Sequence, residues 1–337
     1  MKLDTNLHAS AMTPPAFADV LGAAQRIQGI ALRTPLVECH ALNERLGGRV
    51  FLKLESLQRT GAFKFRGAVN RLSRLAEDGV ESVIAYSTGN HGQAIATAAR
   101  LFGQQATIVM PQDAPQSKIA RAKAAGATIR FYDRSTESRE GIAAEIREQQ
   151  GGVIVPPGDD PAIIAGQGTV ALEAVQDLQR LGLTPDVLLT PCGGGGLSAG
   201  CAIVLNAISA QTELYAVEPA QFNDTERSLA ADARLEIADR NARSICDALL
   251  APIPAELPFS VNRHHLKGVL TVTDAEVMRA MRFGLEDAKV LIEPGGAVAL
   301  SAALEKRISL EGRTAIIVCS GGNVDTDLIA RLLEQEG

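Results

Sequence analysis

The sequence predicts an α/β fold built on parallel sheets. Short runs rich in Val, Ile and Leu alternate with longer runs whose apolar residues recur at helical spacing, and this alternation is typical of strand–helix–strand units. The 337 residues correspond to one large or two ordinary domains, and the 46% of hydrophobic residues are enough for packed cores. We therefore expect a folded protein with two α/β domains.

The first half of the chain begins with a predicted helix at 14–34 and a predicted strand at 51–56. A regular series follows, with predicted strands at 83–86, 106–111, 128–133 and 152–157 and predicted helices at 93–102, 117–126 and 137–149. Turn-forming residues at 156–161 end this series. We therefore expect residues 81–160 to form a small mobile domain, and residues 1–80 and 161–337 to form a large domain.

The second half of the chain continues the alternation, apart from an irregular polar stretch at 220–259. It contains predicted strands at 186–192, 213–219, 269–272 and 313–323 and predicted helices at 168–182, 198–208, 274–288 and 325–336. Thr273 and Glu276 have the spacing of a capping box at the start of the helix at 274–288.

The composition narrows the possible partners. The net charge of −6 and the scattered basic residues argue against a nucleic-acid partner. The five cysteines are odd in number and lack metal-ligand spacing, which indicates reduced thiols. The N-terminus lacks the order of a signal peptide, and no run of about 18 apolar residues could span a membrane. We therefore expect a cytoplasmic protein without a membrane partner.

One lysine, Lys64, stands between the strand at 51–56 and the helical pattern from Phe65 to Leu75. Phe63 and Phe65 flank it. The positive end of a helix dipole and apolar neighbours both lower the pKa of an amine. Such a lysine can form a Schiff base with an aldehyde. The alternative is an ordinary solvated lysine on a helix surface.

A run of glycines, Gly193 to Gly196, separates an apolar strand from an apolar helix. Backbone amides at such a helix start bind phosphate groups. Gly194, Gly196 and Ala199 also match the dinucleotide fingerprint G-x-G-x-x-A, with Glu218 as a ribose-binding acid, so a nicotinamide dehydrogenase is one alternative. A tight turn without any ligand is another.

Two further polar segments, 87–91 and 320–323, each follow a predicted strand. Ligands of open α/β sheets gather at the carboxyl ends of the strands, so these segments, the lysine and the glycine run should converge on one crevice. Pyridoxal phosphate requires an amine for its aldehyde, amides for its phosphate, and partners for its ring nitrogen and ring hydroxyl. The complete set therefore favours pyridoxal phosphate, whereas a dehydrogenase explains only the glycines.

Four ordered motifs, SLQRTGAFKFRGA, STGNHGQA, PCGGGGLSAG and CSGGN, resemble those of fold-type II pyridoxal-phosphate enzymes, and within them the serine/threonine dehydratase and serine racemase group. The resemblance implies a fold like the tryptophan synthase β subunit, with two open parallel-sheet, three-layer domains and the cofactor in the cleft. It also implies a homodimer. The cofactor contacts that it implies are Lys64 as the Schiff-base lysine, Phe63 beside it, Asn90 at the ring hydroxyl, Gly193, Gly194, Gly195, Gly196 and Leu197 at the phosphate, Ser320 at the pyridine nitrogen, and Glu293 close to the ring.

The resemblance implies β-elimination of a hydroxy amino acid such as L-threonine or L-serine to a 2-oxo acid and ammonia. Lys64 would act as the base that takes the Cα proton. A neutral Ser320 hydroxyl cannot keep the cofactor ring protonated, which favours prompt loss of a β-leaving group over a long-lived carbanion. A serine or aspartate racemase is one alternative, and an amino-acid-binding module without cofactor is another.

The substrate would be a small amino acid, whose α-carboxylate the loop residues Ser87, Thr88, Asn90 and His91 would bind. Thr88 stands where the racemases carry a serine that reprotonates the opposite face of the substrate, so the resemblance implies a catalytic hydroxyl there. The methyl group of Thr88 restricts the rotamers of this hydroxyl, so we expect dehydration to exceed racemisation. Arg139 matches an arginine near the β side of the substrate in this group. It could pair with a second carboxylate, which makes a 3-hydroxyaspartate a further candidate substrate.

The segment VEPAQFND resembles the metal loop of the racemase group. The resemblance implies that Glu218, the carbonyl group of Phe222 and Asp224 hold a divalent cation. Ligands that are all oxygen atoms suit Mg²⁺ or Ca²⁺. A solvated acidic loop is the alternative.

Overall fold

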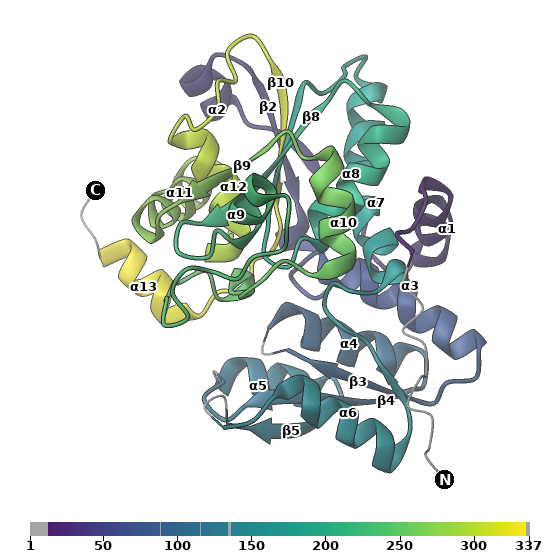
Figure 1. Ribbon diagram of the computed structural model, residues 1–337. Helices are drawn as coiled ribbons and strands as arrows, with labels where there is room; N and C mark the ends of the chain where they lie inside the picture. Colours follow the sequence, from purple (N-terminus) through teal and green to yellow (C-terminus); the bar gives the residue numbers. More distant parts are fainter. Residues whose placement is uncertain (1–12, 88, 115, 134–135, 335–337) are drawn as a thin grey trace.

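The computed structural model describes residues 13–87, 89–114, 116–133 and 136–334. Two open β-sheets form separate units, a larger unit in the upper part of Figure 1 and a smaller unit below it. The predicted α/β class with parallel sheets is confirmed. No helix in the described part of the chain is both long and apolar enough to cross a membrane.

The large unit contains a six-stranded sheet in the order β1-β2-β10-β7-β8-β9. These strands are β1 (Leu36–Glu38), β2 (Arg49–Leu54), β7 (Val187–Pro191), β8 (Glu213–Pro219), β9 (Gly268–Val272) and β10 (Thr314–Cys319). Every neighbouring pair is parallel except β1 and β2, which are antiparallel.

Helices cover both faces of this sheet. They are α1 (Phe17–Ile27), α2 (His40–Leu46), α3 (Lys64–Glu77), α7 (Pro161–Arg180), α8 (Gly196–Ile208), α9 (Asp224–Ala231), α10 (Glu256–His265), α11 (Asp274–Glu286), α12 (Pro294–Leu304) and α13 (Thr326–Glu334), with short 3₁₀ turns η1 (Glu55–Leu57) and η2 (Asp247–Leu249). In β7, Val187 and Leu189 pack on the side of α11 and α12, whereas Leu188 packs on the side of α7 and α8. Burial on both faces explains why the strands are continuously apolar in sequence.

The small unit contains a fully parallel sheet in the order β5-β4-β3-β6. Its elements are β3 (Ser82–Tyr86), α4 (Asn90–Leu101), β4 (Gln105–Pro111), α5 (Gln116–Ala124), β5 (Thr128–Tyr132), α6 (Arg139–Gln150) and β6 (Val153–Ile154). All of them lie within 81–160, but their core also includes Phe65 and Val69 of α3 and Ile163 of α7. Helix α3 therefore contacts both units. The mobility of residues 81–160 stays a prediction.

Several predicted boundaries were wrong. The helix predicted at 14–34 ends at Ile27, because Gly29 has a left-handed φ of 76° and the chain then becomes extended toward Pro35. The sequence patterns did not predict β1, α2, α9, α10 or α12. Helix α9 lies within the stretch expected to be irregular, and α10 begins in it. The predicted capping box of α11 is confirmed, since Thr273 Oγ1 accepts from the Glu276 N–H and Glu276 Oε2 accepts from the Thr273 N–H.

Candidate active site

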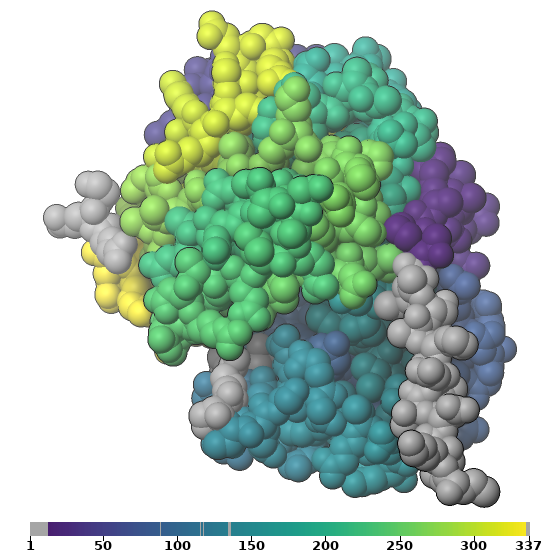
Figure 2. Space-filling view, viewed as in Figure 1, coloured from purple at the N-terminus to yellow at the C-terminus, as the bar shows by residue number. Residues whose placement is uncertain are grey.

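A cavity of about 340 Å³ lies where the two units meet. Figure 2 shows a hollow between the green segment of the large unit and the blue-green small unit. The cavity wall brings together most of the predicted site residues: Phe63, Lys64, Ser87, Asn90, His91, Arg139, Gly193, Gly194, Gly195, Gly196, Leu197, Glu293 and Ser320. These residues come from distant parts of the sequence, and the carboxyl ends of strands in both sheets deliver several of them.

Lys64 is the first residue of α3 and is partly buried. Its Nζ donates to the Pro157 carbonyl at 2.9 Å and lies 5.1 Å from the centre of the Phe63 ring. Burial lowers its pKa to about 8. Near physiological pH, a much larger fraction of this amine is therefore neutral than in a solvated lysine. A nucleophile or base must be neutral to react.

The glycine run joins β7 to α8 and forms part of the cavity wall. Gly195 has a left-handed φ of 87°, which turns the backbone at the start of α8. Within the described part of the chain, the backbone N–H groups of Gly193–Leu197 have no hydrogen-bond acceptor. A row of unbonded amides at a helix N-terminus suits a phosphate group.

Ser320 follows β10 and is buried against the turn that precedes α3, where the Phe63 N–H donates to the Ser320 carbonyl at 3.0 Å. Glu293 lies at the start of α12 and accepts from Asn90 Nδ2 at 2.6 Å. Burial raises the pKa of Glu293, although the Asn90 hydrogen bond and the cations Lys118 and Arg121 oppose the shift. A hydroxyl, a carboxamide and a carboxyl group therefore share this side of the cavity.

The loop between β3 and α4 holds the residues predicted to bind the substrate carboxylate. Ser87 Oγ accepts from the Gly89 N–H at 3.2 Å, and α4 begins at Asn90. The buried His91 donates from Nε2 to the Val155 carbonyl at 2.9 Å, since a carbonyl can only accept. Burial lowers the pKa of His91 to about 3, so the ring is neutral. Thr88 lies outside the described residues.

Arg139 begins α6 at the rim of the cavity. Its side chain is 40% exposed and pairs with Glu140 at 2.8 Å. Its guanidinium carbon lies 5.4 Å from the centre of the Tyr86 ring, and Tyr86 also lines the cavity. The small unit thus presents one cation at the rim.

The residues predicted to bind a metal lie together but away from the cavity wall. Glu218 lies near the end of β8 and Asp224 begins α9, and both are 0% exposed. Glu218 accepts from the N–H groups of Thr225 and Glu226, both at 3.0 Å, whereas both carboxylate oxygens of Asp224 lack a hydrogen-bond partner among the described residues. Burial raises the pKa of both groups, and repulsion by Asp224 adds to the shift of Glu218. In the described part of the chain, no group of three or more His, Cys, Asp or Glu side chains could hold a metal.

Sequence reasoning missed the residues that support the site. Asn323 donates to Asn90 Oδ1 and to the Thr60 carbonyl, both at 2.8 Å, and accepts from Arg121 of α5 at 3.2 Å. It therefore orients Asn90 and links the two units. Asn323 belongs to the CSGGN motif, which was the only signal that could have identified it.

The residues of the cavity fit pyridoxal phosphate. An amine of lowered pKa, a row of unbonded amides, a buried hydroxyl and an oriented carboxamide face one space. These are the groups that its aldehyde, phosphate, ring nitrogen and ring hydroxyl require.

Comparisons with known proteins agree with this fit. The profile of the family described as "Pyridoxal-phosphate dependent enzyme" matches residues 27–321. The L-threo-3-hydroxyaspartate ammonia-lyase of Pseudomonas sp is 42% identical over 320 residues, which cover 95% of this chain and 98% of that protein. The serine racemase of Schizosaccharomyces pombe is 37% identical over 322 residues, which cover 95% and 98%. The structure of maize serine racemase superposes with a TM-score of 0.87 at 34% identity, and covers 95% of this chain and 97% of that one.

The family predicted from the four motifs is therefore confirmed. A profile match over most of the chain and full-length relatives above 30% identity agree with the geometry of the cavity. The chain belongs to the pyridoxal-phosphate dependent enzymes.

Proposed function

We propose that this enzyme is an ammonia-lyase that converts a β-hydroxy amino acid into a 2-oxo acid and ammonia. The observation that carries the proposal is the convergence of the Lys64 amine, the amides of Gly193–Leu197 and the neutral Ser320 hydroxyl on one cavity. The relatives named L-threo-3-hydroxyaspartate ammonia-lyase and the L-threonine ammonia-lyase of Thermotoga maritima, 35% identical over 320 residues, support it.

Bound pyridoxal phosphate withdraws electrons from the substrate Cα, which acidifies its proton and promotes loss of a β-substituent. The protein supplies the base and the orientation. The Lys64 amine takes the Cα proton, and its lowered pKa keeps a useful fraction of it neutral. In this proposal Ser320 faces the pyridine nitrogen, and Asn90, held by Asn323, faces the ring hydroxyl. Because a hydroxyl does not hold the ring protonated, Ser320 favours elimination over transamination.

The loop before α4 binds the substrate α-carboxylate in this proposal. The Ser87 hydroxyl and the amides at the start of α4 are donors, and the positive end of the helix dipole favours an anion there. His91 is neutral and bound to Val155, so it contributes shape and its backbone amide rather than charge. Thr88 stays a predicted participant.

L-threo-3-hydroxyaspartate is the substrate that the cavity favours. Its second carboxylate would pair with Arg139, whose present partner Glu140 is an exposed neighbour on the same helix. The two relatives that are 42% and 39% identical carry this substrate in their names. Racemisation of serine is the second candidate, supported by the serine racemase of S. pombe at 37% identity.

The test is a panel of L-threo-3-hydroxyaspartate, L-serine and L-threonine, assayed for 2-oxo acid, ammonia and chirality. We expect equal amounts of 2-oxo acid and ammonia, with hydroxyaspartate preferred. Arg139→Ala should raise KM for hydroxyaspartate at least about tenfold and leave KM for L-serine nearly unchanged, because only one substrate carries a second carboxylate. Formation of D-serine faster than pyruvate would favour the racemase instead.

A divalent cation, Mg²⁺ or Ca²⁺, is also proposed at Glu218, Asp224 and the carbonyl of Phe222. The two unpartnered oxygens of Asp224 support it, because buried carboxylates without partners are costly. The cation would neutralise a buried acidic pair outside the cavity and so stabilise the large unit. The homodimer and the cytoplasmic location stay predictions.

A further inference from the structure

Asn262 of α10 donates a hydrogen bond to the turn at the centre of the glycine run. Asn262 is 1% exposed, and its Nδ2 group donates to the Gly195 carbonyl at 3.2 Å and to Ser198 Oγ at 3.1 Å. Ser198 Oγ donates in turn to the same carbonyl at 2.9 Å. The Ala199 N–H of α8 also donates to this carbonyl at 2.9 Å, so three donors fix the orientation of a single peptide group.

That peptide group includes the N–H of Gly196, the first residue of α8. In a planar trans peptide the carbonyl and the N–H point in opposite directions. Because the Gly195 carbonyl points toward Asn262, the Gly196 N–H points away from it, and Gly196 lines the active-site cavity. Asn262 thus helps to direct one amide of the glycine run that has no acceptor among the described residues.

The fit between Asn262 and the turn is close. A Cβ atom at Gly195 would lie 2.7 Å from Asn262 Nδ2, and the φ of 87° there is a conformation that other residues rarely adopt.

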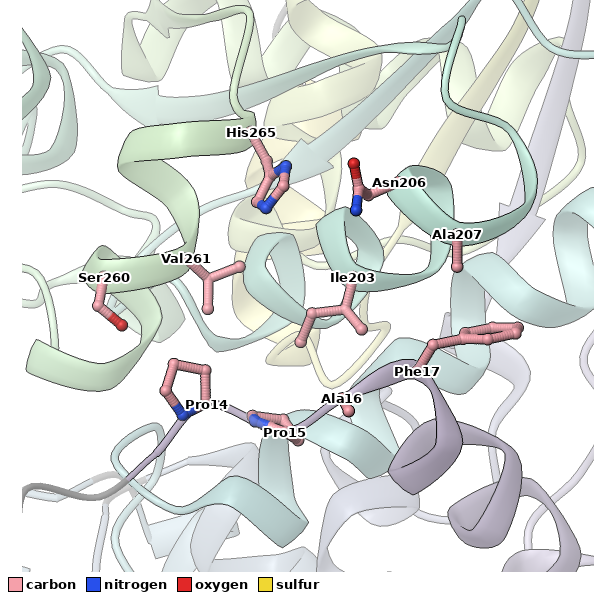
Figure 3. Close-up of a pocket in the computed structure, with 10 residues that line it drawn as sticks. All are labelled: Pro14, Pro15, Ala16, Phe17, Ile203, Asn206, Ala207, Ser260, Val261 and His265. Carbon is pink, nitrogen blue, oxygen red and sulfur yellow. The ribbon is translucent and has the colours of Figure 1, made fainter.

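The preceding residues of α10, Ser260 and Val261, instead line a second cavity of about 330 Å³. Figure 3 shows that cavity between α10 and the α8 residues Ile203 and Asn206.

We propose that Asn262 is a positioning residue for the phosphate group of pyridoxal phosphate. The inference rests on the proposed function, because it takes Gly193–Leu197 as the phosphate site. Without the amide of Asn262, the Gly195 carbonyl keeps two donors from α8, the Ser198 hydroxyl and the Ala199 N–H. It loses its only donor from another element among the described residues, so the peptide is held less firmly. A carboxylate at this position would keep the shape but repel both the Gly195 carbonyl and the phosphate.

The experiment titrates the apoenzyme with pyridoxal phosphate and, separately, with pyridoxal, which lacks the phosphate. Absorbance of the covalent link to Lys64 reports binding of both. Asn262→Ala should weaken pyridoxal phosphate about tenfold, which corresponds to the loss of one hydrogen bond, and Asn262→Asp should weaken it further. Both variants should bind pyridoxal as the wild type does, because pyridoxal makes no use of the glycine run.

Ser260→Ala, on the same helix, and Asn206→Ala, on α8, serve as matched controls and should leave both affinities unchanged. Thermal melts of the apoenzymes identify any variant that has lost its fold, and the ratio of the two affinities is compared among folded variants. Parallel loss of both affinities, or an Asn262→Asp variant that binds pyridoxal phosphate as tightly as the wild type, would overturn the inference. Failure of the wild type to bind pyridoxal phosphate at all would refute the proposed function itself.

Discussion

Two groups of buried charged side chains in the large unit differ in whether they have partners of opposite charge. In the first group, which we call the charge network, Arg66 donates to both carboxylate oxygens of Glu55, each at 2.8 Å, and to those of Glu173 at 2.7 and 2.8 Å. Lys53 donates to Glu173 at 2.6 Å and to the Thr34 carbonyl at 2.8 Å. Two cations and two anions therefore cancel inside the core.

The second group is the pair of carboxylates Glu218 and Asp224, which has no cation paired with it in the described part of the chain. The two acids differ in the direction of their pKa shifts. Burial raises the pKa of Glu218, whereas Arg66, Lys53 and Thr34 together more than offset the burial of Glu55 and lower its pKa. Lys64 resembles the second group, because burial alone lowers its pKa. The matched charges hold β2, η1, α3 and α7 together, and at the unmatched charges we propose that a ligand supplies the missing partner.

Breaking the charge network should have the largest effect on stability. Arg66→Met leaves Glu55 and Glu173 without their main partner, so we expect the free energy of unfolding to fall by about 3–5 kcal/mol in urea denaturation. The control is Arg180→Met, which removes an exposed pair with Asp177 and should cost less than about 1 kcal/mol. Equal effects of the two substitutions would contradict the distinction between matched core charges and surface pairs.

Adding a divalent cation as the proposed partner of Glu218 and Asp224 should raise the free energy of unfolding, by less than Arg66→Met lowers it. Mg²⁺ or Ca²⁺ at about 100 times its Kd should stabilise the protein by about 2.7 kcal/mol, and a chelator should reverse this in a thermal melt. Glu218→Gln should abolish the stabilisation by the cation. Glu55→Gln should destabilise the protein but leave the stabilisation by the cation intact. A melting temperature that does not change with cation or chelator would rule out the proposed cation site.

The site residues predicted from the sequence lie in short motifs, whereas the contacts that it did not predict join residues distant in the chain. Lys64 and the glycine run have local signatures, since flanking aromatic residues and consecutive glycines are visible without a fold. Asn262 contacts a residue 67 positions earlier in the chain, and Arg66 pairs with Glu173 across 107 positions. Such long-range pairs carry no periodic pattern. Strand β1 was not predicted because its three residues are too few to show one.

The third prediction concerns pH and has the smallest effect. Covalent labelling of the apoenzyme at Lys64 by pyridoxal phosphate should reach half its maximal rate near pH 8 rather than near 10.5, because burial disfavours the charged amine. The folded state binds fewer protons than the unfolded state between these two values, so the contribution of Lys64 to stability should rise with pH across that interval. Below pH 8 the full cost of burying the charge remains. A labelling profile centred near 10.5 would mean that Lys64 is solvated.

The most direct test of the account is the identity of the residue that holds the cofactor. The holoenzyme is reduced with borohydride, digested and mapped by mass spectrometry, with Lys64→Ala treated in parallel. The account predicts that the cofactor is attached to the peptide containing Lys64 in the wild type, and that the variant yields no labelled peptide and no 2-oxo acid. Attachment to another lysine, or full turnover by Lys64→Ala, would contradict it.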